Sequence, residues 1–189
     1  MKHSTEKIDF IKHIVFDRDG TLLNFVSYLS DINQVKLIKG VKEGISTLKD
    51  LGHKIYLHTN QSGISRGYFN FNKVVECNNE MIDLIGLGPH VFEEICIASD
   101  FPQKKNSYRK PSPKFGNEII KKTKIDKNLL IYVGDNITDI ETAKNIGCRA
   151  IGVNYGLSNL QKIINERKDI DFLTFNSFSE VIEEIIKVQ

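Results

Sequence analysis

Two carboxylates lie two residues apart in the run Phe16-Asp17-Arg18-Asp19-Gly20-Thr21, near the start of this 189-residue chain. Asp17 could attack a phosphorus atom or bind a metal ion, and Asp19 could transfer a proton. Gly20 permits a sharp turn whose N–H groups could face an anion. Turns rich in Asp and Gly are common, so the run taken alone is also compatible with a structural turn.

Further polar residues lie at the ends of predicted strands or, for Arg109 and Lys110, just before a predicted helix. They are Thr59, Asn60 and Gln61, then Arg109 and Lys110, and finally Asp135, Asn136 and Asp139. Two acidic groups could share a hard cation such as Mg²⁺, which prefers oxygen ligands. A lysine, an arginine, a hydroxyl and an amide suit the oxygens of a phosphate. Each residue also has a plainer interpretation, such as a turn, a solvated lysine or a helix cap, but their corresponding positions favour one shared site.

The spacing of apolar residues predicts the elements that must position these side chains. Strands are predicted at 11–16, 53–58, 94–98, 129–133 and 149–153, with a short edge strand at 172–173. Helices are predicted at 41–51, 71–85, 113–122, 138–146, 158–167 and 177–187. The helix at 113–122 is expected to be capped by Ser112, with Pro113 in its first turn. The alternation predicts an α/β fold with a doubly wound, mostly parallel sheet and helices on both faces, which brings the polar strand ends to one edge.

Length and composition indicate one globular domain spanning residues 1–189. The formal net charge of +2 is too small to indicate a nucleic-acid or membrane partner. The scattered cysteines Cys77, Cys96 and Cys148 lack metal-binding spacing and are typical of free thiols in a reducing compartment. No apolar run has membrane-spanning length, and the polar N-terminus does not resemble a signal peptide. We therefore expect a cytoplasmic protein without a membrane partner, and a monomer.

The motifs together resemble those of the haloacid dehalogenase-like phosphatases. The similarity rests on Asp17-Arg18-Asp19-Gly20-Thr21, then Thr59, Lys110, and Gly134-Asp135 followed by Asp139, and it extends from about residue 11 to residue 187. It implies that Asp17 is the nucleophile and Asp19 the acid and base. It further implies phosphate binding by Thr59, Asn60 and Lys110, and Mg²⁺ bound by Asp17, the Asp19 carbonyl and Asp135. Asp139, with Asn136 beside it, would orient Lys110 or the water ligands of the metal rather than bind the metal itself.

Two segments resemble one branch of this family more closely. Residues 59–67 and 109–113 are similar to those of the branch that contains heptose bisphosphate phosphatases and histidinol-phosphate phosphatases. Bacterial members of this branch typically carry a zinc loop of three Cys and one His just before the Arg-Lys-Pro motif. The corresponding residues here are Ala98, Asp100, Asn106 and Tyr108, a set that does not favour zinc. The resemblance therefore implies Mg²⁺ as cofactor, and we expect no structural zinc.

The substrate implied by this resemblance is a small phosphorylated metabolite, first of all a sugar bisphosphate. Arg66, Arg109 and Gln61 are candidates for binding the rest of the molecule, and the two arginines could hold a second phosphate. The gaps between motifs are too short for a cap domain, so the site should be open. Histidinol phosphate remains an alternative, followed by the 3′-phosphate of a polynucleotide and by a non-catalytic domain that kept the fold. A nucleic-acid partner is not favoured by the weak charge.

Overall fold

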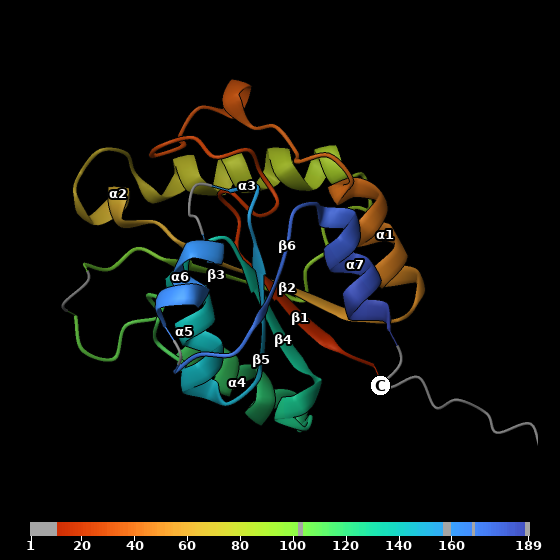
Figure 1. Cartoon of the computed structure of the whole chain (residues 1–189). Coiled ribbons are helices and arrows are strands. Elements are labelled where there is room, and N and C mark those ends of the chain that lie inside the picture. Colours follow the sequence, from red (N-terminus) through yellow and green to blue (C-terminus); the bar gives the residue numbers. More distant parts are fainter. Residues whose placement is uncertain (1–10, 102–103, 157–159, 168, 188–189) are drawn as a thin grey trace, which may run out of the picture.

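A six-stranded parallel sheet forms the centre of the computed structural model, which describes residues 11–101, 104–156, 160–167 and 169–187 (Figure 1). Its strands are β1 (His13–Phe16), β2 (Lys54–Asn60), β3 (Glu94–Ala98), β4 (Leu130–Gly134), β5 (Arg149–Val153) and β6 (Leu173–Phe175). The order β3-β2-β1-β4-β5-β6 places β1 between β2 and β4. The predicted doubly wound sheet is therefore confirmed. The chain adds strands on one side of β1 as far as β3, and then crosses to the other side of β1 to add β4, β5 and β6.

Helices cover both faces of this sheet (Figure 1). They are α1 (Val41–Asp50), α2 (Ser62–Ser65), α3 (Phe71–Ile85), α4 (Lys114–Thr123), α5 (Ile137–Ile146), α6 (Leu160–Glu166) and α7 (Phe178–Ile186), with 3₁₀ turns η1 (Ile32–Gln34) and η2 (Lys127–Leu129). One hydrophobic core joins the sheet to α1, α3 and α7, and a second joins its other face to α4 and α5. In β1, Ile14 and Phe16 enter the first core and Val15 enters the second, because successive strand residues point to opposite faces.

Several predicted boundaries differ from the structure. β2 continues to Asn60 instead of ending at residue 58, because Thr59 and Asn60 pair with Ile97 and Ala98 of β3. The one-turn helix α2 was not predicted, and β6 lies at 173–175 rather than 172–173. The first two residues of the predicted helix 158–167 lie outside the described residues.

The N-terminus of α4 also differs from the prediction. Its N-cap is Pro113, which makes no side-chain cap, so the helix begins one residue later than expected. The Ser112 hydroxyl still accepts a hydrogen bond from the Lys114 backbone N–H at 3.3 Å, from one residue further out. Within the described residues, none of the helices combines the length and apolar character needed to cross a membrane.

Candidate active site

Lys110 bridges two aspartates at the carboxyl edge of the sheet. The Asp17 N–H donates to the Val133 carbonyl at 2.9 Å, which holds Asp17 at the end of β1. The Lys110 ammonium donates to Asp17 Oδ1 at 2.6 Å and lies 2.5 Å from Asp139 Oδ1. All three side chains are at least nine-tenths buried. The structure therefore brings together the ends of β1, the loop before α4 and the first turn of α5.

The first turn of α5 fixes Asp139. Asn136 is the N-cap of this helix, and its side-chain oxygen accepts from the Thr138 N–H at 3.1 Å. In return, Asp139 Oδ2 accepts from the Asn136 N–H at 3.1 Å, which completes a capping box. One oxygen of Asp139 is thus used by the helix and the other faces Lys110. This geometry agrees with the orienting role expected for Asp139 and Asn136, which stays a prediction.

Three carboxylates cluster at this site, and two of them contact the Lys110 ammonium. Asp17, Asp135 and Asp139 each offer an oxygen, and these atoms lie within 4.8 Å of one another. Burial raises the pKa of Asp17 to about 8; the charge of Lys110 opposes this shift, while Asp139, Asp135 and Asp19 add to it. For Lys110, burial alone would lower the pKa, but the charges of Asp139 and Asp17 outweigh it and raise the pKa. The site therefore carries excess negative charge that a cation would relieve.

Three glycines leave space for the carboxylates because they have no side chain. A Cβ atom at Gly20, where φ is +86°, would lie 2.4 Å from Asp135 Oδ2, and one at Gly156 would lie 2.4 Å from the same atom. At Gly134, a Cβ atom would lie 2.2 Å from Asp139 Cγ. Real Cβ contacts are about 1 Å longer, so each glycine allows a carboxylate to pack directly against the backbone.

A second network holds Asp19. Its carboxylate accepts hydrogen bonds from the Arg18 guanidinium at 3.0–3.1 Å and from Gln61 Nε2 at 2.8 Å, with the Thr59 hydroxyl at 3.5 Å. Arg18 is completely buried and also donates to Asn78 Oδ1 of α3 at 2.9 Å. The Asp19 side chain remains 18% exposed. Arg18 and Gln61 therefore fix the orientation of a carboxylate that still reaches the surface of the site.

The backbone of Lys110 is bound by Asn60 of β2. Asn60 Oδ1 accepts from the Lys110 N–H at 2.9 Å, and Asn60 Nδ2 donates to the Lys110 carbonyl at 3.2 Å. The amide expected to bind phosphate thus holds the lysine, and its direct contact with phosphate stays a prediction. In the preceding loop, Asp100 accepts from the Ser107 hydroxyl at 3.0 Å and pairs with Lys104 at 2.7 Å. Within the described residues, polar side chains therefore order this loop.

Arg109 lines a cavity beside the acidic centre. It is half-buried, and its NH1 group has no hydrogen-bond partner among the described residues. Burial lowers its pKa, and the charge of Arg66 lowers it further. Arg66 ends α2 and is exposed, and it does not line the two cavities described next. The two guanidinium groups thus lie within electrostatic reach of each other, and that of Arg109 lies beside the acidic centre.

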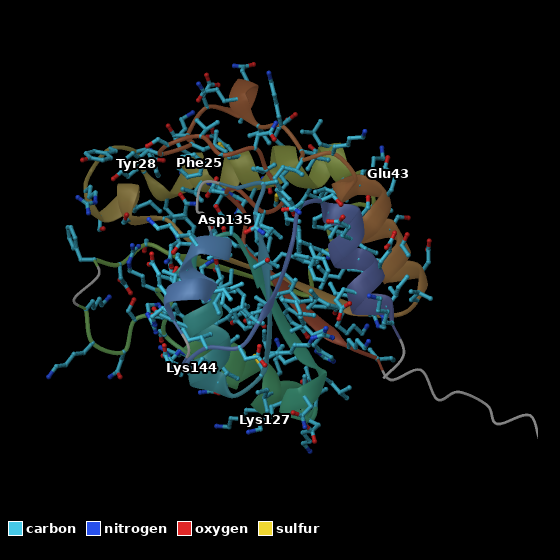
Figure 2. All side chains as sticks on the ribbon, viewed as in Figure 1. Phe25, Tyr28, Glu43, Lys127, Asp135 and Lys144 are labelled. Carbon is cyan, nitrogen blue, oxygen red and sulfur yellow. The ribbon has the colours of Figure 1, made fainter. Side chains whose placement is uncertain are left out.

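Two adjoining cavities open at this edge. The first, of about 210 Å³, is lined by the acidic centre together with Asn60, Arg109, Lys110 and Phe25. The second, of about 270 Å³, lies between residues 25–29 and the start of α2. The two share Asp19, Phe25 and Asn60. Figure 2 shows Phe25 and Tyr28 at the same end of the molecule as Asp135, away from Lys127. A phosphate ester could place its phosphate in the first cavity and its remainder in the second.

Sequence reasoning missed four contributors to the site: Arg18, Asn78, Gly156 and Phe25. Gly156 follows the end of β5, and this position at a strand end was the signal that could have drawn attention to it. Arg18 lies inside the first motif, where an arginine between two aspartates could have suggested an internal ion pair. No sequence signal marked Asn78 or Phe25, because only the packing of α3 and of the 22–39 connection brings them here.

Comparisons with known proteins agree with this geometry. The family model for haloacid dehalogenase-like hydrolases matches residues 25–153. A D-glycero-beta-D-manno-heptose-1,7-bisphosphate 7-phosphatase of Pasteurella multocida is 36% identical over 146 residues, which cover 70% of this chain and 76% of that protein. The histidine biosynthesis bifunctional protein HisB of Buchnera aphidicola is 31% identical over 179 residues. That alignment covers 92% of this chain but 48% of HisB.

The fold has a solved counterpart as well. The D,D-heptose 1,7-bisphosphate phosphatase from B. bronchiseptica, whose crystal structure contains magnesium and phosphate, superposes with a TM-score of 0.82. The superposition covers 93% of this chain and 98% of that one, at 23% sequence identity. The match to the family model covers more than half of the chain, and the Pasteurella protein is similar over most of its length. The chain belongs to the haloacid dehalogenase-like hydrolase family.

Proposed function

We propose that this protein is a Mg²⁺-dependent phosphomonoesterase that acts through an aspartyl-phosphate on a small phosphorylated metabolite. The observation that carries the proposal is the buried contact of Lys110 with Asp17 and Asp139 at the floor of an open cavity. A carboxylate there can approach phosphorus only if the charge between them is neutralised. Lys110 supplies part of that neutralisation.

The acidic centre fits a magnesium ion. Its donors are carboxylate oxygens, one lysine does not compensate their charge, and Gly20 and Gly156 leave room for Asp135 to pack against the backbone. The ion would be held by Asp17, Asp135 and the Asp19 carbonyl. Asp139 also belongs to the carboxylate cluster, but its Oδ1 atom pairs with the Lys110 ammonium. When bound, the ion would withdraw charge from the phosphoryl oxygens.

The residues divide the reaction into two displacements. An Asp17 oxygen attacks phosphorus, the bond to the ester oxygen breaks, and Asp19 gives that oxygen a proton. Asp19 then takes a proton from a water molecule as its oxygen attacks phosphorus, which frees Asp17 and inorganic phosphate. Lys110 donates to the phosphoryl oxygens throughout. Arg18 and Gln61 keep the Asp19 carboxylate at the cavity wall.

A sugar bisphosphate is the substrate that the charges favour. The Arg109 guanidinium, which lines the first cavity and has Arg66 nearby, suits a second anionic group. Heptose bisphosphate, on which the Pasteurella relative acts, carries such a group. Histidinol phosphate is the second candidate, because the similarity to HisB spans almost the whole chain. Its cationic amine, however, would be repelled by both arginines.

The test is a measurement of phosphate release with Mg²⁺ from four substrates. These are heptose 1,7-bisphosphate, heptose 7-phosphate, histidinol phosphate and an oligonucleotide with a 3′-phosphate. We expect the bisphosphate to have the highest kcat/KM, and the Asp17→Asn variant to be inactive with all four. A preference for the oligonucleotide that falls steeply with salt would show that the substrate is a polynucleotide end. Turnover by Asp17→Asn above about a hundredth of the wild-type rate would refute the covalent step.

A further inference from the structure

The segment that carries Lys110 is attached to the sheet by side chains. Among the described residues, no backbone–backbone hydrogen bond joins residues 104–111 to a strand; Lys104 bonds to Phe101 and Ser112 bonds to Arg109. Consecutive peptide groups of this segment are bound instead by side chains from elsewhere. Asn60 binds both backbone groups of Lys110, and Asn145 of α5 donates to the Pro111 carbonyl at 2.9 Å. The position of Lys110 therefore depends on these side chains.

His58 of β2 makes a further attachment to this segment. Its Nε2 atom lies 2.8 Å from the Tyr108 carbonyl oxygen, and its Nδ1 atom lies 3.3 Å from the Tyr132 hydroxyl. A carbonyl oxygen can only accept, so Nε2 must carry the proton. Burial, together with the nearby charge of Lys110, lowers the pKa of His58 to about 3 despite the opposing hydrogen bond to Tyr108. The ring is therefore neutral, and Nδ1 accepts from the Tyr132 hydroxyl. The contacts thus select one tautomer of the imidazole.

The surroundings of His58 give it one orientation. The side chain is completely buried and packs edge-on against Phe115 of α4, with ring centroids 5.1 Å apart. It also packs edge-on against Tyr132 of β4 at 6.0 Å. The carbonyl that it binds lies two residues before Lys110, and Asn60, two residues later on β2, binds Lys110 itself. His58 and Asn60 therefore project from the same face of β2 and grip the segment at two points.

We propose that His58 is a positioning residue that places the Lys110 ammonium between Asp17 and Asp139 by holding the Tyr108 carbonyl. The proposal rests on the proposed function only for its kinetic consequence, since the placement of Lys110 is a structural property. Without the hydrogen bond from His58 to the Tyr108 carbonyl, the segment can move relative to β1. A shift of about 1 Å in a charged group at a reacting centre is enough to cost roughly 100-fold in rate.

Two amide variants of His58 test this directly. His58→Gln can place an amide N–H close to the position of Nε2, whereas the amide of His58→Asn is too short and ends near the position of Nδ1. The matched control is His13→Asn, which alters another buried histidine that contacts a tyrosine hydroxyl, Tyr56, at 2.9 Å. His13 begins β1, at the opposite end of the sheet from Lys110. If His58→Asn does not fold, His58→Phe, which keeps the ring without its donor, replaces it.

Crystal structures and kinetics of these variants give separate readouts. We expect the Lys110 ammonium to leave Asp17 in His58→Asn and to stay in His58→Gln and His13→Asn. The kcat of His58→Asn should fall roughly 10- to 100-fold, with little change for the other two. In a Lys110→Met background, the His58→Asn change should cost no further activity, because it acts through the lysine.

The outcomes distinguish this inference from the proposed function. Lys110 in its wild-type position in His58→Asn, or an undiminished effect of His58→Asn in the Lys110→Met background, would overturn the inference. Failure of the wild-type protein to release phosphate from any ester would overturn the proposed function instead. The crystal structures would still decide the role of His58 in that case.

Discussion

Substitution of Gly156 by alanine should reduce activity by displacing Asp135. A Cβ atom at this position would lie 2.4 Å from both Cβ and Oδ2 of Asp135. Ordinary contacts of this kind are about 3.4 Å or more, so the carboxylate must move by roughly 1 Å. Such a displacement of a metal-binding group costs on the order of 100-fold in kcat/KM, or about 2.7 kcal/mol in the activation free energy. The backbone of Gly156 does not have a positive φ, so the effect should come from crowding.

The assay is a titration of phosphatase activity with Mg²⁺. In Gly156→Ala, half-maximal activity should require more Mg²⁺, since Asp135 is a proposed ligand. The control is Gly52→Ala, where φ is +80° but no atom lies within 4 Å of the added Cβ. That variant should lose about 1 kcal/mol of stability through backbone strain and keep its activity. Wild-type kcat/KM and Mg²⁺ dependence in Gly156→Ala would refute the argument.

Three other perturbations have distinct expected results. Arg109→Ala should raise KM for a bisphosphate by the equivalent of about 1.5–3 kcal/mol and leave KM for a monophosphate almost unchanged. An equal rise in KM for both substrates in steady-state kinetics would contradict a role in binding a second anion. The affinity for Mg²⁺, measured by calorimetry, should rise about tenfold per pH unit up to about pH 8, because the ion must displace the proton of Asp17, whose metal-free pKa is raised to about 8. A flat pH profile, or the same slope in Asp17→Asn, would exclude this linkage. Arg18→Met should lower the free energy of unfolding in urea by about 3–5 kcal/mol, because it leaves Asp19 without its buried partner; a loss below about 1 kcal/mol would show that the pair adds little.

Much of the fold could be predicted from local patterns. The bounds of α3, β3 and β5 agree with the prediction, because an apolar period, a flanking glycine or a β-branched run marks each of them. The errors lie where tertiary contacts decide. β2 is longer than predicted because the polar residues Thr59 and Asn60 pair with β3, and local propensity does not contain that information.

The convergence of the site residues could be predicted, but their contacts could not. Asp17, Lys110 and Asp135 were expected at one sheet edge because the carboxyl ends of parallel strands meet there. The partners of each polar atom depend on side-chain packing. Asn60 thus binds the Lys110 backbone, and Arg18 reaches Asn78 of α3, a residue sixty positions away in the chain.

The two hydrogen bonds from Asn60 to the Lys110 backbone have a consequence for how substrate specificity can change in this family. Because the Lys110 backbone groups and the Tyr108 carbonyl are all held from β2, the exposed residues further upstream need not fix the position of the lysine. Mutations that alter the length or charge of the stretch around Lys104 and Lys105 can therefore accumulate while the chemical step is preserved. The enzyme's entrance can evolve separately from its catalytic floor, and the same stretch offers protein engineers a place to graft new recognition loops.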